Sequence, residues 1–146
     1  MFELYQWMYL IHVLGAVALG YYFVLPFLLG RTRSLAGQSL ADFAGNVHAV
    51  GRIMQLFLLV QLVTGFYMMW GTRYEVFWES AVLVLLIAIG ALTGIMGGKL
   101  KKAVQAIKSG GDGTAALASV RTLSWVLFVA LLLMVYVMTV HEYFFA

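Results

Sequence analysis

The sequence lacks cysteine altogether, contains a single proline and has few charged residues. Without cysteine, the chain cannot form disulfide bonds, thiolate metal sites, iron–sulfur clusters or a cysteine nucleophile. Charged residues make up 10% of the 146 residues, whereas soluble domains average about 25%. These are too few polar side chains to cover a water-facing surface, so the composition excludes a soluble domain.

The charged residues comprise 9 Lys or Arg and 6 Asp or Glu, which give a net charge of +3. The basic residues are spread over short segments and form no single patch, so no nucleic-acid partner is expected. The high apolar content also excludes intrinsic disorder. Any chemistry must therefore use histidine, methionine, tyrosine or carboxylate side chains.

Apolar sequence is abundant, since 64% of the residues are hydrophobic. The apolar segments cover residues 4–29, 53–70, 77–96 and 123–140. Each has about the 20 residues that cross ~30 Å of hydrocarbon at ~1.5 Å per residue. We therefore expect an all-α integral membrane protein: a bundle of four transmembrane helices, forming a single domain over residues 1–146, with the lipid bilayer as its surroundings.

The basic residues also predict an orientation. All but one lie between the first two spans or between the last two: Arg31, Arg33, Arg52, Lys99, Lys101, Lys102, Lys108 and Arg121. Only Arg73 falls on the other side. Because cytoplasmic loops carry the excess of basic residues, we expect both termini on the non-cytoplasmic side, in a membrane such as the bacterial cytoplasmic membrane.

Helix signals extend these spans and interrupt one of them. Ser39 and Thr114 can cap helices that run into the second and fourth spans from the cytoplasmic side. Pro26 lies inside the first span and removes one backbone donor, which predicts a kink near its inner end.

The third span carries Gly90, Gly94 and Gly98 on one helical stripe. Small residues at a spacing of four allow another helix to approach closely. That helix can belong to the same chain or to a second copy, and we expect a homodimer.

Ionisable residues inside a bilayer are functional candidates, and the chain has 3 histidines. Counting back from Arg31 places His12 about 28 Å into the membrane, and counting forward from Arg121 places His141 about 30 Å in. The two imidazoles should thus lie at nearly the same height, on two helices of one small bundle. We expect His12 and His141 to share a ligand.

The neighbours of this pair favour haem b. Two imidazoles suit the axial positions of a haem iron. Gly15 and Ala16 follow His12 on the same helix face and leave it bare, and Met138 lies on the face of His141. Arg73, in the short outer loop, is the expected partner of the haem propionates.

His48 is a weaker metal candidate near the cytoplasmic boundary. It shares a helix face with Arg52 and Gln55, which can bind a lipid headgroup, a quinone head or propionates. A second, inner haem on His48 would have Met54 or Met96 as neighbours. Copper is the alternative metal, because methionines gather in the outer halves of the spans and thioether plus imidazole suits Cu(I): Met8, Met68, Met69, Met134 and Met138.

A family resemblance rests on three features. These are the run Leu10-Ile11-His12-Val13-Leu14-Gly15 with Pro26 downstream, the pair Thr64-Gly65 late in the second span, and the basic residues after the third span. The pattern resembles small four-helix bacterial membrane proteins of the CopD-like and HemJ-like kind. The resemblance implies a haem b site on His12, with protoporphyrinogen oxidase activity for the HemJ kind and a copper association for the CopD kind. HemJ-like proteins carry a lysine near the start of the third helix, where this chain has Ser80-Ala81-Val82.

The resulting functional hypothesis is a haem b-binding membrane protein for electron transfer or for redox chemistry of oxygen or nitric oxide, with a quinone or another redox partner. A HemJ-like protoporphyrinogen oxidase and a copper-handling or transport protein are the alternatives. No residue is assigned a catalytic role.

Overall fold

The computed structural model describes residues 2–70 and 74–144, with the backbone alone for 141–144. Within these residues the chain is helical throughout apart from short connections. The elements are α1 (Phe2–Leu19), α2 (Tyr21–Gly30), the short 3₁₀ helix η1 (Arg31–Ser34), α3 (Gly37–Met69), α4 (Val76–Lys108) and α5 (Thr114–Phe144). Four stretches are long and apolar enough to cross a membrane, which confirms the predicted number of spans.

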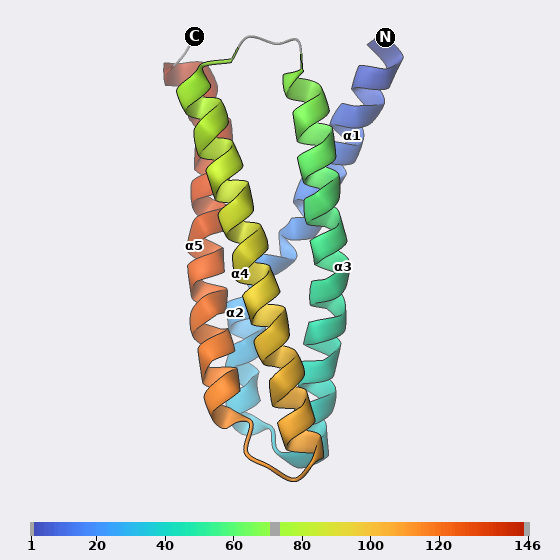
Figure 1. Ribbon diagram of the computed structural model, residues 1–146, viewed down its shortest axis with the longest axis vertical. Helices are drawn as coiled ribbons and strands as arrows, with labels where there is room; N and C mark the ends of the chain where they lie inside the picture. Colours follow the sequence, from blue (N-terminus) through green and yellow to red (C-terminus); the bar gives the residue numbers. More distant parts are fainter. Residues whose placement is uncertain (1, 71–73, 145–146) are drawn as a thin grey trace.

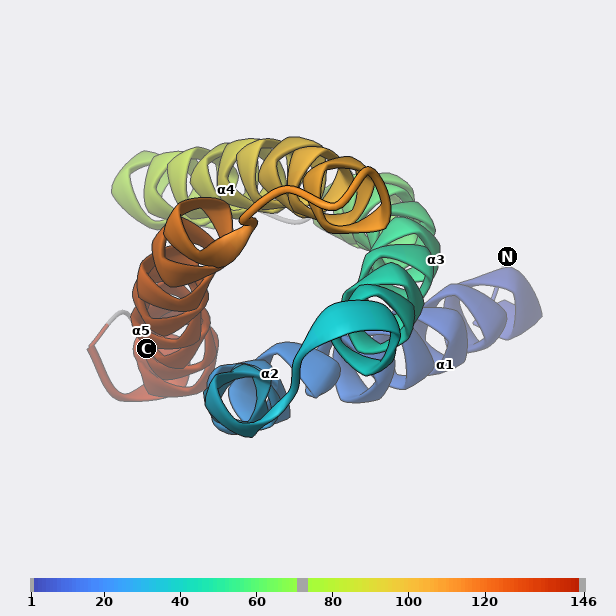
Figure 2. The same ribbon diagram turned by 90° about the horizontal axis from the view of Figure 1, so that it is seen from below.

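The helices are arranged as a ring when the bundle is seen from below (Figure 2). α3 packs on α4, α4 packs on α5, and the first span closes the ring in two parts. α1 packs on α3, whereas α2 packs on α5 through edge contacts of Phe23 with Phe128 and of Phe27 with Trp125. α3 and α4 diverge toward the end of the bundle that holds the start of α1 and the end of α5. At that end the pair α1–α3 stands apart from the pair α4–α5 (Figure 1).

The first span is interrupted at Gly20 rather than at Pro26. The Gly20 N–H bonds to the carbonyl of Val17 at 3.0 Å, a tighter turn than that of an α-helix. A Cβ at Gly20 would lie 2.8 Å from the same carbonyl oxygen, so only glycine fits this turn without a shift. Pro26 is buried inside α2, which continues to Gly30. The kink predicted at Pro26 is therefore misplaced by six residues.

The helices extend beyond the predicted spans. α3 and α4 have 33 residues each, or about 50 Å of helix against ~30 Å of hydrocarbon. The two predicted caps differ in detail. α3 already begins at Gly37, so Ser39 lies within its first turn. At α5, Asp112 Oδ1 accepts the Thr114 backbone N–H at 2.9 Å, and this hydrogen bond lowers the pKa of the exposed Asp112 carboxyl.

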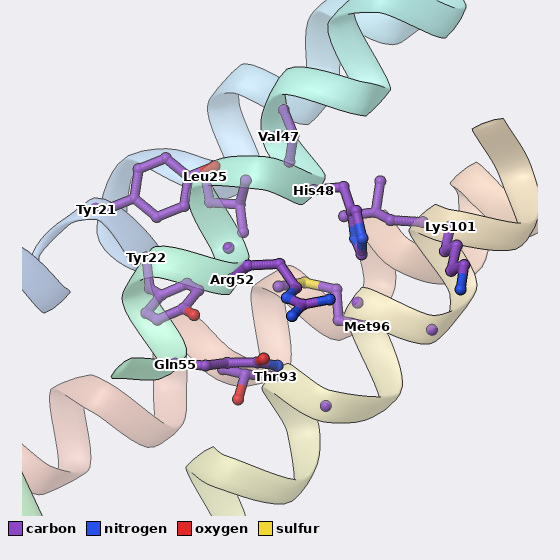
Figure 3. A pocket seen from close by; sticks show the side chains of 15 residues that line it. Tyr21, Tyr22, Leu25, Val47, His48, Arg52, Gln55, Thr93, Met96 and Lys101 are labelled. Atoms are coloured by element: carbon purple, nitrogen blue, oxygen red, sulfur yellow. The ribbon is translucent and has the colours of Figure 1, made fainter. Parts of the chain in front are cut away.

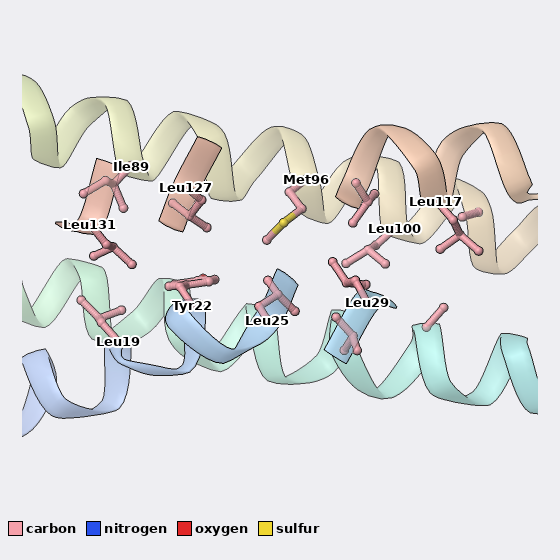
Figure 4. Packing of buried hydrophobic residues seen from close by; sticks show 14 of the residues in the cluster. Leu19, Tyr22, Leu25, Leu29, Ile89, Met96, Leu100, Leu117, Leu127 and Leu131 are labelled. Carbon is pink, nitrogen blue, oxygen red and sulfur yellow. The ribbon is translucent and has the colours of Figure 1, made fainter. Parts of the chain in front are cut away.

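The core occupies the middle of the bundle and its basic end, meaning the end with η1 and the α4–α5 connection. Leucines from α2, α4 and α5 meet Tyr22 and Met96 there (Figure 4). At the opposite end, the Trp78 indole N–H donates to the carbonyl of Val137 at 2.9 Å and ties α4 to α5. The His12 side chain lies at this less packed end, on the other helix pair.

Candidate functional site

His12 is held by α3, and its backbone and its side chain are both bound. The Gln61 side-chain amide donates to the His12 carbonyl at 2.8 Å, and His12 Nδ1 lies 2.8 Å from Thr64 Oγ1. Gln61 and Thr64 are both buried, while His12 is half-buried. The α1–α3 interface thus fixes the imidazole of His12 on a polar patch inside an apolar span, and we call these three residues the His12 clamp.

The hydrogen bonds of Thr64 determine the tautomer of His12. The Thr64 hydroxyl has one proton, and it donates this proton to the carbonyl of Val60 at 2.7 Å. With that proton used, the Thr64 oxygen accepts from His12, and the hydrogen-bond network assigns the ring proton to Nδ1. Nε2 of a neutral imidazole is then unprotonated, and no hydrogen bond to Nε2 occurs among the described residues. A histidine that binds a metal through one ring nitrogen usually donates from the other ring nitrogen to a neighbouring acceptor.

Two glycines make this close approach of helices possible. A Cβ at Gly65 would lie 3.2 Å from Cε1 of His12, and a Cβ at Gly15 would lie 3.2 Å from Nε2 of Gln61. The sequence assigned Gly15 to a bare surface for a macrocycle, but in the structure the Gln61 side chain occupies that space. Ala16, the other residue of the expected bare face, is exposed.

The remaining predicted site residues lie elsewhere. Met138 is 38% exposed on α5, and α5 packs on α4 and α2 rather than beside the start of α1 (Figure 1). His141 belongs to α5, but its side chain lies outside the described residues, and so does Arg73. The pairing of His12 with His141 therefore stays a prediction. The structure instead gives His12 the partners Thr64 and Gln61.

A second polar region contains His48. A cavity of about 280 Å³ lies between α2, α3 and α4 near the basic end (Figure 3). Its lining includes His48, Arg52 and Gln55, which the sequence grouped on one face, together with Met96 and two glycines of the stripe, Gly94 and Gly98. A Cβ at Gly90, Gly94 or Gly98 would meet no atom within 4 Å. No helix of the described chain packs closely on the stripe, and two of its glycines form a cavity wall.

The roles of Gln61, Thr64 and Gly65 around His12 were missed from the sequence. Gln61 and Thr64 are polar residues one turn apart in an apolar span, and Gly65 follows at once. This pattern signals a polar contact with another helix, but it does not say which helix. The Tyr21 and Tyr22 hydroxyls in the cavity were missed because aromatic residues in a membrane span are typical of lipid contact as well.

Among the described residues, no group of three or more His, Cys, Asp or Glu side chains could hold a metal ion. A haem is compatible with this result, because the porphyrin itself supplies the equatorial ligands and the protein adds one or two axial ones.

The fold defines the class of this chain: an all-helical protein with four helices long and apolar enough to span a membrane. Comparison with family models, curated proteins and solved structures gives no match that would narrow the class further.

Proposed function

We propose that the chain is a membrane redox protein that binds haem b through Nε2 of His12. The observation that carries the proposal is the hydrogen bond from Nδ1 of His12 to Thr64, which leaves Nε2 unprotonated within a membrane span. An ionisable group placed there is costly unless it serves a ligand or a partner. The CopD-like and HemJ-like resemblance points to the same residue.

When bound, haem supplies one-electron redox chemistry. The His12 clamp would hold the imidazole in one orientation and, through the Thr64 acceptor, in one tautomer. If His141 also bound the iron, the two histidines together would hold the haem and the site would suit electron transfer. With His12 alone, the haem could bind oxygen or nitric oxide.

The test is the absorption spectrum of the protein purified in detergent after expression with ample haem. We expect a Soret band and a b-type pyridine haemochrome. Thr64→Val removes the acceptor for Nδ1 and should weaken haem binding about 10–100-fold, the usual effect of losing an outer partner of a ligating histidine. Thr64→Ser keeps the hydroxyl and should retain most of the affinity.

Thr122→Val is the matched control, because the exposed Thr122 bonds only to the Ala118 carbonyl of its own helix, at 3.2 Å. It should leave the haem spectrum unchanged. The proposal fails if no Soret band forms, or if metal analysis finds about one equivalent of copper without iron. Equal haem affinity for the wild type and Thr64→Val would contradict the role of the clamp.

We also propose that both termini lie on the non-cytoplasmic side of a bacterial cytoplasmic membrane. The basic residues of η1, α4 and the start of α5 support this, because they gather at one end of the bundle. Since the chain has no cysteine, single-cysteine variants report on topology directly. In spheroplasts, a membrane-impermeant maleimide should label Glu3→Cys at once and Ser109→Cys only after permeabilisation. The reverse pattern would invert the orientation.

A further inference from the structure

Several buried polar groups in the cavity between α2, α3 and α4 have no hydrogen-bond partner among the described residues. Tyr22 has 0% of its surface exposed, and its hydroxyl has no hydrogen-bond partner among the described residues. The Tyr21 hydroxyl and His48 Nδ1 are buried and unpartnered as well. All three residues line the cavity. Unpaired polar groups of this kind destabilise a fold unless something in the cavity satisfies them.

The lining offers hydrogen-bond donors and no carboxylate. Gln55 adds an amide, and Figure 3 shows the Tyr22 hydroxyl on the same side of the cavity as Gln55 and Thr93. The Thr93 hydroxyl already donates to the Gly90 carbonyl at 2.9 Å, so it can only accept. The tyrosine hydroxyls and the Gln55 amide remain available as donors, so they suit a ligand that presents acceptor oxygens.

Charge decides which acceptors fit. The two cations of the lining, Arg52 and Lys101, are exposed at the rim, whereas the buried donors of Tyr21 and Tyr22 are neutral. A phosphate placed against neutral hydroxyls would lose more hydration than it regains. A carbonyl oxygen accepts well from a neutral donor. The buried end therefore favours an uncharged carbonyl over an anion.

The shape points to a flat ring with a lipophilic tail. Gly94, Gly97 and Gly98 leave part of the α4 wall without side chains, and Leu25 and Met96 supply apolar surface. Arg52 on α3 and Gly94 and Gly98 on α4 line the cavity and are exposed, so its mouth lies between α3 and α4. Its volume, about 280 Å³, is at the lower limit of small-molecule sites, near ~300 Å³. Such a site takes a single ring system more readily than a macrocycle.

We propose that this cavity binds the head of a lipid-soluble quinone. One ring carbonyl would accept from Tyr22 and Gln55 at the buried end, the ring would lie against the glycines of α4, and the tail would leave between α3 and α4 into lipid. This site is separate from the His12 clamp, so it does not depend on haem binding.

Binding of decylubiquinone to the purified full-length protein in detergent, measured by calorimetry, tests the proposal. Tyr22→Phe removes one oxygen atom and should weaken binding about five- to tenfold. Because the hydroxyl has no partner without ligand, the same substitution should raise the melting temperature of the ligand-free protein. These opposite effects separate a ligand donor from a structural hydroxyl, whose loss would lower the melting temperature. Tyr136→Phe, on an exposed residue of α5, should change neither quantity.

Filling the glycine wall gives a second variant. Gly94→Leu should abolish decylubiquinone binding, and Gly90→Leu, one turn away and outside the lining, should retain it. His12→Ala should bind the quinone as the wild type does, which distinguishes failure at this site from failure of the haem proposal. The proposal is overturned if decylubiquinone does not bind, if Tyr22→Phe binds it equally well, or if dodecyl phosphate displaces it in a manner lost in Arg52→Gln.

Discussion

Gly65→Leu should eliminate the haem spectrum as completely as His12→Ala does, although Gly65 has no side chain that could bind haem. Even a Cβ at this position would lie 3.2 Å from Cε1 of His12, and a leucine side chain would displace the imidazole from Thr64. Moving a ligating nitrogen this way should reduce haem affinity on the order of 100-fold or more. Overpacking at the α1–α3 interface should also cost about 1–3 kcal/mol of stability. Soret absorbance and thermal unfolding in detergent measure the two effects.

Gly45→Leu is the control for that experiment. It lies on the same helix, where a Cβ would meet no atom within 4 Å, and it should leave both the Soret band and the melting temperature nearly unchanged. Were Gly65→Leu to keep full haem occupancy, His12 would not be held against Gly65 in the haem-bound protein.

Gly20→Ala should destabilise the protein by about 1–3 kcal/mol, the usual cost of adding atoms where the packing leaves no space for them. In a regular helix the same change normally stabilises by up to ~1 kcal/mol. The sign reverses here because the added Cβ would lie 2.8 Å from the Val17 carbonyl oxygen, and backbone atoms must move to relieve the contact. The melting temperature in detergent is the measurement.

Gly30→Ala serves as the opposite case within the same span. Gly30 ends α2 with helical torsions, φ −58° and ψ −34°, and a Cβ there has no neighbour within 4 Å. It should be neutral or slightly stabilising. If Gly20→Ala raises the melting temperature as Gly30→Ala does, the added Cβ at Gly20 is accommodated and the prediction is wrong.

The four spans were predictable because bilayer thickness sets a length that hydropathy reports directly. The extension of α3 and α5 past the membrane on the side of the basic residues also followed from the capping residues ahead of the second and fourth spans. The break at Gly20 did not. A glycine in a membrane helix is common, and whether it becomes a turn depends on two different neighbours, α3 on one side of it and α5 on the other.

The place of His12 along a membrane span was predictable, but its partner was not. A count of residues gives the height of a side chain in the membrane, because rise per residue is fixed. It gives no order of helices around a bundle. The sequence therefore set His12 opposite His141 by height, whereas the structure sets α3 next to α1 and supplies Gln61 and Thr64. Interhelical order arises from packing of all four spans, and no local pattern encodes it.

The division of the first span between two neighbours has a consequence for biogenesis. During synthesis α1 can pair with α3 as soon as the second span enters the membrane, and the His12 clamp forms within this early hairpin. α2 has its packing partner in α5, which leaves the ribosome after α3 and α4. Nascent chains that end before Thr114 should therefore already contain the α1–α3 pair while α2 still faces lipid, and the ring should close only once α5 has been inserted.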